Sequence, residues 1–129
     1  MTLVVPAVGE VIALTKFLDS SLYIRLYSND VTPSNTTTTA SFVECTGGGY
    51  SEKLILPGDW VITQGDPSNA ESPELTWTFT GAPTPAPGLY GYYIVDASNV
   101  LLWAERFPVV PILPVLDSTA KITPRITAN

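Results

Sequence analysis

The stretch ELTWTFT (Glu74–Thr80) has the clearest alternation of apolar and polar residues in the chain. Leu75, Trp77 and Phe79 fall on one face and three threonines fall on the other, which is the period of a half-buried β-strand. Such a strand needs neighbours to pair with and a second layer to cover its apolar face. The stretch therefore predicts a β-sheet protein with its core on one side of this sheet.

Short apolar runs recur along the rest of the chain, and Gly, Pro, Asn or Asp residues separate each run from the next. The 9 glycines and 12 prolines in 129 residues leave little room for long helices. We therefore expect an all-β fold, an antiparallel, jelly-roll-like β-sandwich of about eight strands. Besides Glu74–Thr80, the predicted strands are Leu22–Tyr27, Ala40–Glu44, Tyr50–Leu56, Asp59–Gln64, Leu89–Asp96, Val100–Phe107 and Thr119–Ile126.

One short helix is predicted ahead of the first strand. Glu10 and Lys16 lie between apolar residues that recur at helical intervals, namely Val8, Val11, Ile12, Leu14, Phe17 and Leu18. This helix either covers one opening of the β core or docks on a partner. We expect a single β-sandwich domain over residues 1–129, in which 1–21 form an arm and the helix and 22–129 form the β core.

The chain contains no histidine. This absence removes the commonest general base, the commonest neutral metal ligand and every Ser–His or Cys–His nucleophile pair. Asp59, Asp66, Glu71 and Glu74 are close in sequence, but their spacing is not that of a calcium-binding loop. We therefore expect a non-enzymatic protein without catalytic residues, metal site or cofactor.

The charge distribution is unfavourable for nucleic-acid or membrane binding. The net charge is −6, and the 6 basic residues are scattered, so no stripe of cations could neutralise phosphates or anionic lipids. The start of the chain lacks the pattern of a signal peptide, and no apolar run approaches the length of a membrane span. The single Cys45 cannot form an internal disulfide, which is compatible with maturation in a reducing cytoplasm.

The segment PVVPILPVL (Pro108–Leu116) has three prolines, six aliphatic residues and no charge. Its prolines exclude a helix or a central strand, and its side chains are too apolar for an ordinary solvated loop. It is either an exposed contact surface or a crossover that packs on its own sandwich. Together with the arm Thr2–Ala7, it supplies the predicted subunit or partner interface: Leu3, Val4, Val5, Pro6, Val109, Val110, Pro111, Ile112, Leu113 and Pro114.

The aromatic residues offer an alternative function. Trp60, Trp77 and Trp103, with several tyrosines, could form a platform on which sugar rings stack, as in a carbohydrate-binding module. Trp77, however, shares its strand face with Leu75 and Phe79, which favours a place in the core. Packing is therefore the favoured interpretation of these side chains, and carbohydrate binding stays an alternative.

Several phrases of the sequence resemble small structural proteins of tailed bacteriophages, above all capsid decoration, or cement, proteins. They are VVPAVGE (Val4–Glu10), LYIRLYSNDVTP (Leu22–Pro33), FVECTGGGY (Phe42–Tyr50), LYGYYIVDASNVLLWAERF (Leu89–Phe107) and ITPRIT (Ile122–Thr127). The resemblance covers most of the chain, but it includes no catalytic signature.

The resemblance implies a virion protein that is made in the host cytoplasm and binds the outer surface of the phage head. There it would assemble as a homotrimer on the major capsid protein and stabilise the shell against the pressure of the packaged DNA. A small tail or fibre component of the same particle is the alternative that this resemblance leaves open. As a decoration protein, the chain would bind other copies of itself and the major capsid protein. It would make no direct contact with nucleic acid or membrane.

Overall fold

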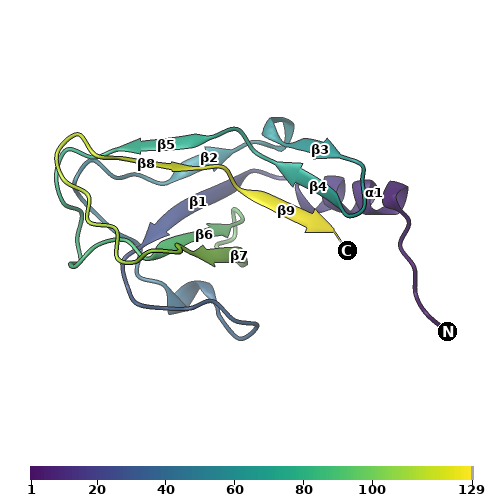
Figure 1. Cartoon of the computed structure of the whole chain (residues 1–129), viewed down its shortest axis with the longest axis horizontal. Coiled ribbons are helices and arrows are strands. Elements are labelled where there is room, and N and C mark those ends of the chain that lie inside the picture. The colour runs from purple at the N-terminus through teal and green to yellow at the C-terminus, as the bar shows by residue number, and fades with distance from the viewer. Residues whose placement is uncertain (129) are drawn as a thin grey trace.

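The computed structural model describes residues 1–128 and contains one α-helix, nine β-strands and two short 3-10 helices (Figure 1). In chain order they are α1 (Ala7–Phe17), β1 (Leu22–Tyr27), η1 (Thr39–Ser41), β2 (Lys53–Ile55), η2 (Pro57–Asp59), β3 (Val61–Thr63), β4 (Ser68–Glu71), β5 (Leu75–Thr78), β6 (Gly91–Val95), β7 (Leu101–Arg106), β8 (Thr119–Ile122) and β9 (Arg125–Ala128). All strand pairs are antiparallel. The predicted all-β class with one short helix is confirmed, with nine strands in place of about eight.

The first layer is a four-stranded sheet in the order β2-β1-β6-β7. Its two central strands pair Ile24 with Ile94 and Leu26 with Tyr92, and β6 is buried along its whole length. The hairpin between β6 and β7 turns at Ala97–Asn99, where Asn99 has a left-handed φ of 64°. Asn tolerates this conformation better than most residues, as the predicted short loop requires.

The second layer is a long ribbon divided into two parts, β3-β4-β9 and β5-β8. β4 continues into β5 and β8 continues into β9, and each continuation is interrupted by a proline, Pro73 or Pro124. Proline lacks the N–H that a ladder needs, so the pairing breaks at these points. One hydrogen bond from the Ser72 N–H to the Pro124 carbonyl (3.0 Å) still joins the two parts.

The main core lies between the two layers. Trp77 and Phe79 are buried and Leu75 is half-buried, whereas the threonines between them are exposed, so the strand face predicted from ELTWTFT is confirmed. The Trp77 indole N–H donates to the Ser51 carbonyl at 2.8 Å, which satisfies the one polar atom that the side chain brings into the core. A second, smaller cluster covers the outer face of β6, where Phe42 stacks on Tyr93 with centroids 4.6 Å apart.

One predicted strand is absent, one observed strand is not predicted, and the predicted strand Thr119–Ile126 is divided into β8 and β9. The predicted strand Ala40–Glu44 begins as the 3-10 helix η1, whose first turn is closed by hydrogen bonds between Thr38 and Ser41, and only Glu44 makes an isolated bridge. β4 was missed, because its sequence SNAE (Ser68–Glu71) is polar and its buried residues are a serine and an alanine. Small side chains suffice there because α1 packs directly on this strand.

The predicted apolar face of the helix is only partly correct. Leu14 and Leu18 are buried, but Val8, Ile12 and Phe17 are exposed, and Glu10 is only 6% exposed. The Glu10 carboxylate accepts hydrogen bonds from the Ser68 hydroxyl (3.3 Å) and the Ser68 backbone N–H (3.4 Å) at the start of β4. These donors allow a carboxylate to lie at the helix–sheet contact. Val8 and Ile12 remain exposed on the outer side of α1.

Candidate association surface

The segment Pro108–Leu116 lies on the surface with most of its aliphatic side chains uncovered. Its one regular attachment is an antiparallel bridge in which Leu89 and Ile112 exchange two backbone hydrogen bonds of 2.8 Å. The prolines on both sides of Ile112 cannot donate to a ladder, so the bridge does not extend into a strand. The backbone of the segment is therefore held at its middle, while most of its aliphatic side chains remain exposed.

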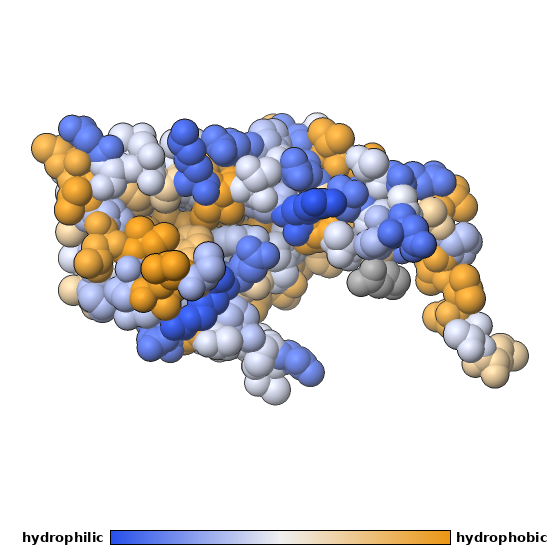
Figure 2. Space-filling model, viewed as in Figure 1, coloured by the Kyte–Doolittle hydropathy of each residue, from blue (hydrophilic) through white to orange (hydrophobic). Residues whose placement is uncertain are grey.

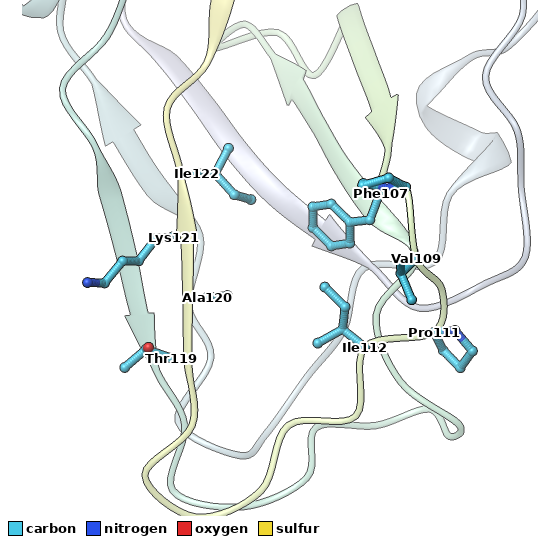
Figure 3. Close-up of a pocket in the computed structure, with 9 residues that line it drawn as sticks. Phe107, Val109, Pro111, Ile112, Thr119, Ala120, Lys121 and Ile122 are labelled. Carbon is cyan, nitrogen blue, oxygen red and sulfur yellow. The ribbon is translucent and has the colours of Figure 1, made fainter.

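Beside this segment the molecule has an apolar hollow of ≈ 460 Å³ (Figure 3). Phe107, Val109 and Ile112 line one wall, and Ala120 and Ile122 of β8 line the other. Figure 3 shows the side chains of Phe107 and Ile122 extending toward one another across the hollow, while that of Lys121 points away. The hollow therefore offers apolar walls and the outer edge of β8 to a ligand.

The N-terminal arm, residues 1–6, runs outward from the start of α1 (Figure 1). Leu3 is 88% exposed and Val4 is 74% exposed. Val5, Val8 and Ile12 continue this apolar surface along the outer side of α1. Val8 and Ile12 are four positions apart and therefore lie on one side of the helix, whereas Val5 precedes the helix in the arm.

The exposed apolar residues form two surfaces, which we name the arm end and the loop end. The arm end consists of Leu3, Val4, Val5, Val8 and Ile12, and the loop end consists of Val109, Ile112, Leu113, Val115 and Leu116. They lie at opposite ends of the long axis of the molecule, as Figures 1 and 2 show. In Figure 2, orange residues gather at both extremities of the visible face.

The structure places the ten predicted interface residues in three environments. Seven are exposed, Val110 and Pro111 are half-buried, and Pro114 is buried; the exposed ones are Leu3, Val4, Val5, Pro6, Val109, Ile112 and Leu113. The predicted interface does not include Val8 and Ile12, because helical spacing leaves open whether their helix covers the β core or docks on a partner. The buried Glu10 between them turns both side chains outward, and no signal in the sequence alone indicates this.

A polar cluster on the outer side of the first sheet holds several elements together. The Arg25 guanidinium donates to Glu52 and to the Asn99 side chain, both at 2.7 Å, and Tyr50 donates to Glu44 at 2.6 Å. Burial, followed by the hydrogen bond to Glu44, raises the pKa of the Tyr50 hydroxyl. These contacts join β1 and β2 to the β6–β7 hairpin, which is a structural role.

Cys45 and the tryptophans are packing residues. Burial, followed by the nearby Glu44 carboxylate, raises the pKa of the Cys45 thiol from 9.0 to about 12, so the thiol stays protonated at neutral pH. Trp60 and Trp77 are buried, and the half-buried Trp103 packs against Trp60 with centroids 5.9 Å apart. Two of the three indoles therefore have no exposed face on which a sugar could stack.

Residues 1–128 contain neither a metal-binding cluster nor a membrane-spanning helix. In that part of the chain, no group of three or more Cys, Asp or Glu side chains is placed to hold a metal ion, and α1 is too short to cross a membrane. No protein-family model, curated protein or solved structure matches the chain. The candidate function therefore depends on the two apolar ends and on the resemblance described above.

Proposed function

We propose that this chain is a non-enzymatic structural protein of a phage particle, a decoration protein that binds the outer surface of the head and stabilises the shell. The observation that carries the proposal is the pair of exposed apolar ends, one on the arm and α1 and the other on Pro108–Leu116. The largest apolar patch on a monomeric soluble protein is about 300–600 Å² and often has a binding function. The resemblance of five sequence phrases to such proteins supports the major capsid protein as the partner.

The mechanism needs only binding. A protein that binds the assembled shell and not its free subunits favours the assembled state by its binding free energy. An oligomer contacts several shell subunits at once, so individually weak contacts add through a high effective concentration. The buried core between the two sheets includes Leu14 of α1 and Leu89, the bridge partner of Ile112, so it anchors the elements from which both surfaces extend.

The experiment is quantitative mass spectrometry of purified particles, with the amount of this chain expressed relative to the major capsid protein. A decoration role predicts a ratio near one copy per capsid subunit. A few copies per particle would instead assign the chain to the tail or fibre. Absence from the particles would overturn the virion proposal altogether.

A second experiment tests stabilisation. Shells that lack this chain are heated with and without the added recombinant protein, and the temperature of shell disruption is measured by light scattering. The proposal predicts a higher disruption temperature with the protein, and Leu113→Asp is expected to weaken the effect. An unchanged disruption temperature at saturating protein would contradict a cementing role.

A further inference from the structure

We infer that copies of this chain associate head to tail, with the arm end of one copy packed into the hollow at the loop end of the next. The donor is the extended segment Thr2–Val5, and the acceptor is the hollow between β8 and Phe107–Ile112. This inference deepens the proposed function by naming the contact between sister subunits. It can be tested on the isolated chain without any particle.

The position of the two surfaces determines the kind of symmetry. A two-fold contact uses the same patch on both subunits, whereas a contact between two different patches produces a ring or a filament. The arm end and the loop end lie at opposite ends of the long axis (Figure 2), so one subunit presents both partners of a head-to-tail contact. A closed ring such as a trimer uses every apolar end and leaves none exposed.

The arm end and the loop end expose similar areas of apolar surface. Burying an aliphatic side chain completely removes about 100 Å² of apolar surface from water. Scaled by the exposed fractions of its five side chains, each end presents roughly 300 Å² of apolar surface. One contact would cover both ends, and with the usual polar share its total buried area would be about 1,000 Å². That area reaches the lower bound for a specific interface.

The free edge of β8 provides backbone partners for the arm. The Phe79 N–H donates to the Ser118 carbonyl at 2.8 Å, just before β5 and β8 pair. Antiparallel alternation then turns the backbone groups of Ala120 and Ile122 toward β5 and those of Thr119 and Lys121 away from it. Four arm residues, Thr2–Val5, match the four residues of β8 in length, as in β-strand addition.

The side chains of the arm also fit the hollow. In an extended arm, Leu3 and Val5 point to one side, so both can enter between Phe107 and Ile122 while Val4 covers the rim. The residues that line the hollow include no acid, and their one cation, Lys121, points away from it. Docking of Thr2–Val5 therefore brings no charged side chain of the arm into the hollow, where an unpaired charge would oppose association.

The test uses sedimentation velocity of the isolated full-length chain at several concentrations. We expect the sedimentation coefficient of the wild type to rise with concentration toward that of a ring or a filament, and Leu3→Asp and Val109→Asp to weaken association at least tenfold. Leu54→Asp is the matched control, because Leu54 is a half-exposed leucine on β2, which belongs to neither end. Thermal melts check that each variant is folded, and deletion of Thr2–Val5 or Leu113→Asp replaces any variant that is not.

A mixing experiment distinguishes head-to-tail contact from other modes. Leu3→Asp retains an intact loop end and Val109→Asp retains an intact arm end, so an equimolar mixture should form a one-to-one dimer that neither variant forms alone. A mixture that stays monomeric would overturn the inference. So would a wild type that is monomeric up to about 100 μM, where even a weak contact should be populated.

The outcomes separate this inference from the proposed function. A monomeric chain that still saturates phage shells would overturn the head-to-tail contact and leave the decoration role intact, with the apolar ends facing the shell. A chain that forms the oligomer but is absent from particles would overturn the decoration role alone. Dissociation by the Leu54→Asp control would show that the contact lies elsewhere.

Discussion

The centre of the first sheet and the two ends of the molecule have similar residue types in opposite environments. Ile24, Ile94 and Val95 on β1 and β6 are completely buried, whereas Leu3 and Val109 are among the most exposed large hydrophobic residues. Hydrophobicity alone therefore does not decide which residues form the core. The difference lies in whether the backbone can join a ladder and whether another layer covers the side chains.

Proline accounts for much of this difference. Pro108, Pro111 and Pro114 remove the N–H donors that a strand beside Leu89 would need, so only the single bridge at Ile112 forms. On β6 every residue keeps its N–H and pairs with β1 on one side and β7 on the other. The same chain thus contains one aliphatic segment that pairs internally and another whose side chains remain available for a partner.

The largest effect is expected at the core strand that decides the fold. Trp77→Ala removes a side chain that is only 2% exposed and leaves both a cavity and an unpaired Ser51 carbonyl. We expect a loss of about 3–5 kcal/mol in the free energy of unfolding, measured by denaturant melts. Thr78→Ala on the exposed face of the same strand is the control and should change little. A near-zero effect of Trp77→Ala would place this residue outside the core.

A second core prediction tests close packing at the centre of the sheet. Gly91 begins β6, and a Cβ atom there would meet the Glu105 carbonyl oxygen and the Tyr27 hydroxyl. Gly91→Ala should therefore cost about 1–3 kcal/mol through overpacking, read from the same denaturant melts. Gly58→Ala, at a site with open space around it, is the matched control. Equal stability of the two variants would contradict the tight approach of β1 and β7.

The sequence predicts the buried face of some elements and gives no sign of others. ELTWTFT indicates its buried face correctly because alternation reports directly on a sheet with one covered side. SNAE on β4 gives no such signal, because its burial depends on α1, which is distant in sequence. Strands held by tertiary packing of small residues are invisible to a periodicity argument.

The candidate surface was predictable in part. The composition of Pro108–Leu116 indicates that it cannot form regular structure, and this leaves exposure or self-packing as alternatives. Only the structure shows which side chains are exposed, and it adds Val8 and Ile12 to the arm end. Their exposure depends on Glu10 meeting Ser68, a contact across 58 positions that no local pattern encodes.

Alkaline pH should lower the free energy of unfolding, because the core contains buried tyrosine hydroxyls and a buried thiol. Burial raises the pKa of the Tyr50 and Tyr92 hydroxyls and of the Cys45 thiol, so the folded state holds these protons more tightly than the unfolded state. Their stability contribution is complete below the unfolded pKa values, near 9 for Cys and 10 for Tyr, and is lost as the pH rises above them. Each group should lower the free energy of unfolding by about 1.4 kcal/mol per pH unit there.

The measurement is a series of denaturant melts between pH 8 and pH 11. Tyr92→Phe removes one titrating group and should make the decline above pH 10 shallower, while Tyr23→Phe, a half-buried tyrosine of β1, is the control. A flat stability curve up to pH 11 would contradict the burial of these protons.

The smallest effect on stability is expected at the loop end. Leu113 is 61% exposed, so Leu113→Asp should change the free energy of unfolding by no more than about 0.5 kcal/mol while it weakens association. Ile112→Asp is the harsher companion, because this side chain lines the hollow and its backbone holds the bridge to Leu89. If Leu113→Asp unfolds the chain as Trp77→Ala is expected to, the segment belongs to the core and the contrast between centre and ends fails. If it leaves both stability and association unchanged, the exposed leucine is not part of a contact, and the arm end must find its partner elsewhere.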